Sequence, residues 1–241
     1  MTEKNHARGV FPPTRRSAVL LVGSDDPAER ARSFDVLVRA YWKPAYKHLR
    51  LRFGRPAEDA SDLIQSFFSR AFEKRWFASY DPSKGRFRTY FKTCLDRHAM
   101  ETDRHERRQK RGGDAVKLSL DFEGAERELE LAEPVVDVEA QFDREWTRQL
   151  LEATTRALEE LCRGQGKEVY FEVFRRSLLV GDSSYREIAE ALGLRVSQVT
   201  NFLAWTRRHF RRLAIEELRA ITASEEELEE ETRALFGGAA P

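Results

Sequence analysis

The sequence predicts an all-α protein in which an acidic linker joins two helical domains, and three observations support this. First, apolar residues recur at intervals of three and four over most of the chain, which is the period of amphipathic helices. Second, no segment shows the strict apolar–polar alternation of a half-buried strand. Third, residues 86–111 and 195–219 are basic whereas 121–145 and 224–231 are acidic, so the net charge of +1 hides two basic modules.

The composition restricts the class of protein. The chain has 241 residues, of which 41% are hydrophobic and 34% charged, as expected for a soluble globular protein. Because no run approaches the roughly 18 apolar residues of a membrane span, we expect a cytoplasmic protein. Cys94 and Cys162 lie far apart and belong to no CxxC or Cys/His cluster. We therefore expect reduced cysteines and neither a metal site nor a cofactor.

The N-terminal part predicts a leader followed by two helices. Residues 1–29 contain prolines and scattered arginines without helical periodicity, so we expect a flexible leader. The first domain is predicted over residues 30–112. Its first helix follows from the apolar series at residues 34–49, which Pro44 is expected to kink. A second helix, over residues 60–72, has a wide apolar face with polar rims.

A turn and a basic third helix complete the first domain. The stretch "WFASYDPSKGR" contains the turn residues Asp81, Pro82 and Gly85. The helix after it begins near Phe87, buries one apolar face and offers a row of basic side chains on the other. The segment "KRGGD" ends the domain.

An acidic linker and a second helical domain follow. Residues 113–140 have little periodicity, many acids and Pro134, so we interpret them as a linker with room for short structured pieces. The second domain is predicted over residues 141–236, with helical spacing at 142–161 and 169–178. The final segment, "SEEELEEETRALF", has a serine before acids in its first turn, which is typical of a helix start.

The stretch "SYREIAEALGLRVSQVTNFL" predicts a helix-turn-helix. Ala189 is small where two helices touch, Gly193 lies at the turn, and Val199 follows ten residues after Ala189 to pack the second helix. Glycine favours the positive φ that such a turn requires. An ordinary helical corner with a solvated basic face is the alternative interpretation.

If this segment binds DNA, its second helix provides both base-reading and phosphate-binding side chains. Polar side chains near its start face base edges, and glutamine and asparagine are suited to adenine. These residues are Arg195, Ser197, Gln198, Thr200 and Asn201. Arginines farther along hold phosphates, which adds salt-sensitive affinity. They are Arg207, Arg208 and Arg211.

The two domains together resemble a family of bacterial proteins. The segments "FDVLVRAYWKPAYKHLR", "DLIQSFF" and "GRFRTYFKTCLDRHAMETDRHERRQKR" resemble the helices of region two of RNA polymerase sigma factors of the extracytoplasmic-function (ECF) type, in the sigma-70 family. The segment "SYREIAEALGLRVSQVTNFLAWTRRHFRRL" resembles the helix-turn-helix of their region four. The resemblance covers residues 34–111 and 142–235. It implies a region two-like bundle at 30–112 and a region four-like domain at 141–236.

The resemblance implies a sigma factor, which performs no covalent chemistry itself and directs core RNA polymerase to promoters. Its partners are then the beta and beta-prime subunits of core polymerase and promoter DNA, and an anti-sigma factor is a further partner that the resemblance allows. The family's polymerase-docking surface maps onto Asp62, Leu63, Gln65, Ser66 and Phe68. For Leu63 and Phe68, a purely structural role in the core is an equal alternative.

The resemblance also assigns DNA contacts to both domains. The region four-like helix-turn-helix binds the minus-thirty-five element, and the region two-like domain recognises and melts the minus-ten element. Holding an unstacked base needs aromatic and polar side chains near basic ones. The matching residues are Trp76, Tyr80, Lys84, Arg86, Arg88, Lys92, Arg97 and Arg104. Individually, aromatic residues of this kind are more often core residues than platforms for bases, and Tyr80 beside the turn is the favoured exception.

Three features depart from the family's pattern. Ser66 stands where an acid is usual, Trp205 replaces a commonly basic residue, and the loop "KRWFASYDPSKGRF" resembles a variant group with an extended basic loop. The acidic linker has two interpretations: a segment that enters the polymerase, as in the family, or a solvating tether.

Two other functions remain as alternatives. A free-standing helix-turn-helix regulator predicts no affinity for core polymerase. A metal-dependent nucleic-acid enzyme would use Asp62, Asp96 or Asp103, yet these carboxylates form no recognisable ligand cluster with a histidine.

Overall fold

The computed structural model describes residues 17–106, 118–132, 137–179 and 185–237, and all regular structure in these ranges is helical, which confirms the all-α prediction. In chain order the elements are α1 (Ala18–Leu21), α2 (Pro27–Arg52), α3 (Ala57–Glu73), the 3-10 turns η1 (Trp76–Ser79) and η2 (Pro82–Lys84), α4 (Phe87–Glu106), α5 (Phe122–Glu130), α6 (Val138–Gly164), α7 (Glu168–Leu179), α8 (Tyr185–Leu192), α9 (Val196–Ile221) and α10 (Glu225–Phe236).

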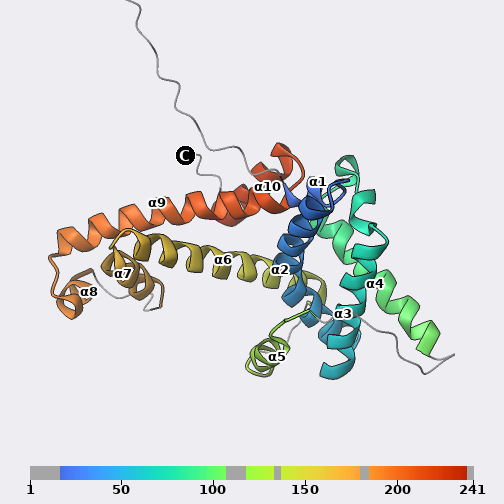
Figure 1. The fold of residues 1–241 in the computed structure, drawn as a ribbon. Coiled ribbons are helices and arrows are strands. Elements are labelled where there is room, and N and C mark those ends of the chain that lie inside the picture. The colour runs from blue at the N-terminus through green and yellow to red at the C-terminus, as the bar shows by residue number, and fades with distance from the viewer. Residues whose placement is uncertain (1–16, 107–117, 133–136, 180–184, 238–241) are drawn as a thin grey trace, which may run out of the picture.

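Two long helices, α6 and α9, lie side by side and connect the two ends of the molecule (Figure 1). Helices α7 and α8 lie at one end of this pair. Helices α1 to α4 gather at the other end, where α10 follows α9. We call these the helix-turn-helix end and the bundle end.

The core of the bundle end is built from aromatic side chains of the first domain. Tyr41, Phe67, Phe87 and Phe91 are fully buried. The rings of Tyr41 and Phe91 stack with centroids 4.5 Å apart, and Phe67 meets Phe91 edge-on at 5.3 Å. Each such side chain contributes about 1.5–3 kcal/mol by burial, so this cluster fixes the relative positions of α2, α3 and α4.

The folded part begins before the first predicted helix. The Asp26 carboxylate accepts a hydrogen bond from the Ala28 N–H at 2.9 Å, and Pro27 stands in the first turn, so α2 has a capped start. Val19 and Val22 are buried against the same core. Residues 17–29 were assigned to a flexible leader from the sequence, but they are folded. The sequence did not indicate this because a single short turn of helix has too few residues to show a helical period.

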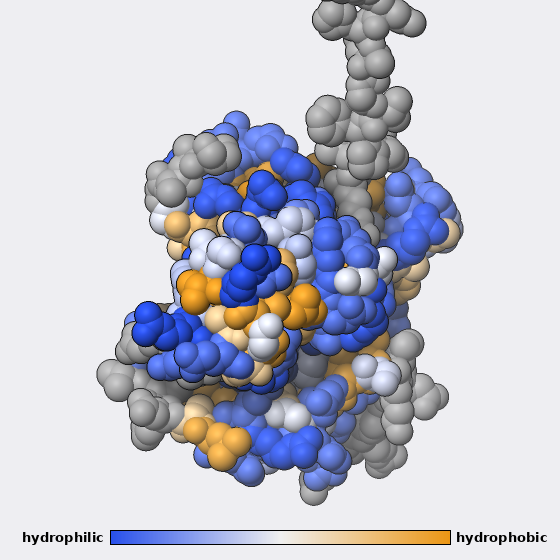
Figure 2. Space-filling model, turned by 90° about the vertical axis from the view of Figure 1, so that its left-hand side faces the viewer, coloured by the Kyte–Doolittle hydropathy of each residue, from blue (hydrophilic) through white to orange (hydrophobic). Residues whose placement is uncertain are grey.

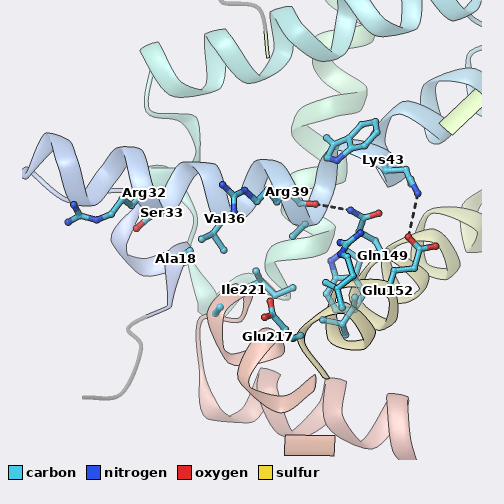
Figure 3. Close-up of a pocket in the computed structure, with 18 of the residues that line it drawn as sticks. Ala18, Arg32, Ser33, Val36, Arg39, Lys43, Gln149, Glu152, Glu217 and Ile221 are labelled. Carbon is cyan, nitrogen blue, oxygen red and sulfur yellow. Dashed lines mark hydrogen bonds and ion pairs between the residues drawn. The ribbon is translucent and has the colours of Figure 1, made fainter. Parts of the chain in front are cut away.

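Helix α2 continues through Pro44 and packs along α6. The Gln149 side chain donates to the Arg39 carbonyl at 3.0 Å, about one turn before the proline, and Lys43 pairs with Glu152 at 3.4 Å (Figure 3). Since proline cannot donate to the preceding turn, α2 lacks one internal hydrogen bond near this contact.

The bundle-end core also contains helices of the predicted second domain. Phe142 and Trp146 from α6, Leu218 and Ile221 from α9, and Leu228 from α10 are buried in it. The two predicted domains therefore share one continuous core.

Part of the segment predicted as an acidic linker is a helix packed on α2. Ala125 of α5 is fully buried, and the Phe122 ring lies 5.2 Å from that of Tyr46. Lys47, whose side chain is only 1% exposed, binds Glu128 of α5 at 2.8 Å and Glu145 of α6 at 2.6 Å. The acids of this segment thus neutralise bases of α2.

Candidate nucleic-acid interfaces

The helix-turn-helix predicted from the sequence is present at one end of the molecule. Helix α8 ends at Leu192, Gly193 adopts a φ of +65°, and α9 begins at Val196. The Leu194 N–H donates to the Ala189 carbonyl at 2.8 Å and closes the turn. A small core of buried side chains holds the two helices against α7, and its members are Val173, Ile188, Ala189, Val199 and Leu203.

The start of α9 presents polar side chains to solvent. Ser197, Thr200 and Asn201 are exposed. Gln198 is half-buried, because its side-chain oxygen accepts a hydrogen bond from the Arg195 backbone N–H at 3.0 Å and caps the helix. The first turns of α9 therefore offer three exposed polar side chains and one that is engaged in a cap.

The predicted phosphate-binding arginines of α9 differ in their surroundings. Arg207 and Arg208 are exposed. Arg211 is half-buried, and its guanidinium lies 5.0 Å from the centre of the Phe236 ring of α10. Of these three predicted arginines, Arg207 and Arg208 therefore present their charge to solvent.

Trp205, which departs from the family's pattern, has a structural explanation. Its ring stacks on His209 at 3.7 Å and meets Tyr170 of α7 edge-on at 5.4 Å, and the Lys167 ammonium lies 4.4 Å from its centre. The tryptophan thus packs α9 against α7.

The helix-turn-helix end has a mostly hydrophilic surface in which apolar side chains gather near the middle (Figure 2). Exposed large apolar residues on α7, α8 and α9 include Leu178, Tyr185 and Val196.

Aromatic side chains of the predicted minus-ten loop hold it against the core of the bundle end. The Tyr80 hydroxyl donates to the Gly85 carbonyl at 2.7 Å, and its ring lies 5.1 Å from that of Phe87. Burial raises the pKa of this phenol to about 12, so it stays protonated. The Trp76 ring lies 5.8 Å from that of Phe67. Both aromatic residues are half-buried and support the loop in this state.

The basic residues of this loop are paired with acids from the far end of the chain. Arg86 binds Glu230 at 2.7 Å, and Arg88 binds Glu231 at 3.1 Å, both on α10. Lys84 is exposed and pairs only weakly with Asp81 at 3.4 Å. Of the remaining predicted contacts, Arg97 is exposed, Lys92 is half-buried, and the side chain of Arg104 lies outside the described residues.

The predicted docking surface on α3 divides into exposed and buried residues. Asp62 is exposed, and Gln65 is half-buried. Phe68 is fully buried and Leu63 is 4% exposed, so both belong to the core. Ser66, where the family usually has an acid, lies 2.9 Å from His98 Nε2.

The partner of Ser66 is a neutral histidine. Burial, with the nearby charge of Arg70, lowers the pKa of His98 to about 4, so the ring is uncharged at neutral pH. A hydroxyl can hydrogen-bond to a neutral imidazole without bringing a charge into this half-buried place.

One contact surface was not predicted from the sequence. The glutamates of α10 were interpreted only as a helix start, yet Glu227, Glu230 and Glu231 contact the start of α4. The available signal was a run of acidic residues, opposite in charge to the basic loop. The sequence around either segment, however, does not indicate that the two segments contact each other.

Within the ranges given above, no group of three or more His, Cys, Asp or Glu side chains is placed to hold a metal ion. No helix in those ranges is long and apolar enough to cross a membrane.

The described residues thus form an all-α protein with a helix-turn-helix at one end and a helical bundle at the other. The family model for the ECF sigma factor matches residues 24–219, and the chain therefore belongs to the ECF sigma factor family. No curated protein and no solved structure matches the chain. The family consists of non-enzymatic transcription initiation factors, and it implies binding to core RNA polymerase and promoter DNA.

Proposed function

We propose that this sigma factor binds core RNA polymerase through the exposed side of α3, reads a minus-thirty-five element with the start of α9, and opens a minus-ten element with the loop before α4 and with α4 itself. The beta and beta-prime subunits are the proposed partners of α3. Two kinds of support are used: the chain's membership of the ECF sigma factor family, and the position of each proposed surface in the fold.

The exposed start of α9 is the observation that carries this proposal. Ser197, Thr200 and Asn201 face solvent on the second helix of a helix-turn-helix, and Arg207 and Arg208 follow two turns later with their charge exposed. Polar side chains at the start of a recognition helix read base edges, and arginines beyond them hold phosphates.

On α3, the polymerase contact is assigned to Asp62 and Gln65. Leu63 and Phe68 pack in the core, so their substitution would disturb folding rather than a contact. The Ser66 hydroxyl is hydrogen-bonded to His98 within the protein. A polar contact can therefore be tested with two substitutions that leave the core intact.

The experiment is co-purification from a lysate of the host organism. The tagged wild-type chain is expected to retain the large polymerase subunits in stoichiometric amount, and the double variant Asp62→Ala, Gln65→Ala is expected to lose at least nine-tenths of them. Asp25→Ala is the matched control, because the Asp25 side chain is fully exposed outside α3. Absence of polymerase from the wild-type eluate at low salt, with no masking protein present, would contradict the proposal and favour a free-standing regulator.

A further inference from the structure

Helix α10 is an acidic helix outside the part of the chain that the family model matches. The match ends at residue 219, whereas α10 spans Glu225–Phe236. Ser224 caps it by accepting a hydrogen bond from the Glu227 N–H at 3.1 Å. Residues 224–231 read "SEEELEEE", with six glutamates. A tail with this charge would normally be solvated, yet three of its glutamates are turned towards the protein.

These three carboxylates surround the start of α4. Glu227 accepts a hydrogen bond from the Phe87 backbone N–H at 2.9 Å. Glu230 binds the Arg86 guanidinium at 2.7 Å, and Glu231 bridges Arg86 at 3.3 Å and Arg88 at 3.1 Å. Two arginines and a helix N-terminus are the groups that proteins use to hold phosphates. The carboxylates thus pair with groups of a kind that also binds phosphates.

The contact is part of the packed structure. Leu228 is buried in the bundle-end core, and the Glu231 side chain is only 5% exposed. Burial raises the pKa of the Glu231 carboxyl, although Arg88 and Arg86 oppose the shift. Desolvation offsets much of the attraction in such pairs, so a phosphate that offers the same arginines an equivalent negative charge can compete with the glutamates.

Arg88 has further partners that do not belong to α10. Its guanidinium lies 4.4 Å from the centre of the Trp146 ring and 3.2 Å from the Asp143 carboxylate, both on α6. The basic site is therefore held in shape by α6 and covered by α10.

From these contacts we infer that α10 is an autoinhibitory latch: its glutamates mimic phosphates, cover Arg86, Arg88 and the start of α4, and must leave before single-stranded minus-ten DNA can bind there. The inference rests on the proposed function, because it takes these arginines to contact DNA. It adds a regulatory element to that function, built from residues beyond the matched family region.

The test uses the full-length chain with its latch charges removed. The latch variant is Glu227→Gln, Glu230→Gln, Glu231→Gln, and the matched control is Glu225→Gln, Glu226→Gln, Glu229→Gln, which removes the same charge from exposed positions of the same helix. The probe is a fluorescein-labelled, single-stranded 20-nucleotide DNA of mixed sequence, and binding is followed by fluorescence anisotropy.

We expect the latch variant to bind the probe about tenfold more tightly than the control, and its salt dependence to rise. Freeing Arg86 for a phosphate increases the magnitude of the slope of log K against log salt by about 0.7 for a single strand, and Arg88, which keeps Asp143 at 3.2 Å, adds at most as much again. Adding Arg86→Ala and Arg88→Ala to the latch variant must abolish both gains. Glu230→Gln alone, a milder change at a half-exposed residue, should give a smaller gain in the same direction.

Equal affinities and slopes for the latch variant and its control would overturn the inference. This failure differs from failure of the proposed function, since loss of polymerase co-purification in the Asp62→Ala, Gln65→Ala variant does not depend on α10. A gain that persists after Arg86 and Arg88 are removed would also overturn it, because the glutamates would then act only through net charge.

Discussion

The two proposed DNA surfaces differ in what their arginines contact. At the helix-turn-helix end, ion pairs are local: Arg212 pairs with Glu216 and Arg163 with Glu159, each four residues apart on one helix. At the bundle end, the arginines of the proposed DNA surface form long-range pairs, since Arg86 reaches Glu230 across 144 residues. An ion pair within one helix leaves the face of that helix accessible to a ligand. An ion pair between distant segments places one segment over the side chains of the other. One surface is thus open and the other is covered.

The same contrast applies to stability. Local, exposed pairs contribute at most a few tenths of a kcal/mol, because water and salt screen them. The bundle end instead contains a nearly buried lysine, Lys47, held between Glu128 and Glu145 from two other helices. Charges there are part of the tertiary structure, and three substitution experiments can sharpen or break the contrast.

The largest effect is expected for Lys47→Ala. This change leaves the carboxylate of Glu145, which is buried, without its partner at 2.6 Å, and it also removes a buried stem. We expect the free energy of unfolding in urea to fall by about 3–5 kcal/mol. The control is Arg163→Ala, whose exposed local pair predicts a change within about 0.5 kcal/mol. Equal losses for the two variants would break the contrast.

A smaller effect is expected on acidification. Burial opposes the ionisation of Glu128, but hydrogen bonds from Lys43 and Lys47 outweigh it and lower the pKa of this carboxyl from 4.5 to about 2. Because the folded-state pKa lies below the unfolded one, the stabilisation is complete above pH 4.5 and is lost as the pH falls towards 2.

Urea unfolding between neutral pH and pH 2 measures this loss. Glu128→Gln should be less stable at neutral pH and should show a shallower decline in acid than the wild type. In high salt, Glu172→Gln on α7 should behave as the wild type, since its pairs with Arg175 and Arg176 are local and partly exposed. A decline as steep in Glu128→Gln as in the wild type would contradict this assignment.

The smallest effect is expected on the free energy of DNA binding when arginines of α9 are replaced. Arg207→Ala with Arg208→Ala should reduce the magnitude of the slope of log K against log salt by about 1.8 for a mixed-sequence duplex, because two phosphate contacts are lost. Arg86→Ala with Arg88→Ala in the otherwise wild-type chain should leave that slope unchanged, since α10 already neutralises these charges. Fluorescence anisotropy over a salt series measures both, and equal losses would show that both surfaces are open.

Sequence alone predicts the helix-turn-helix because its information is local. Ala189, Gly193 and Val199 lie within eleven residues, and each has a packing or backbone reason for its place. The helical faces of the first domain are predicted for the same reason. Periodicity identifies a buried face without reference to any distant segment.

The covering of the basic loop could not be predicted in this way. Ser224 and the acids after it predict a helix start, but no local pattern indicates which distant arginine they meet. Similarly, Leu63 and Phe68 were equally consistent with core and docking, and only their burial decides between the two. Long-range pairing depends on the complete fold, which the spacing of residues along one helix does not encode.

The central claim, that one arginine surface is open and the other covered, can be measured directly by the rate at which phenylglyoxal modifies each arginine, followed by mass spectrometry. In the wild-type chain, Arg207 and Arg208 should be modified quickly and Arg86 and Arg88 slowly. In the variant Glu227→Gln, Glu230→Gln, Glu231→Gln, Arg86 should become as reactive as Arg207. Equal rates for Arg86 and Arg207 in the wild-type chain would contradict the account.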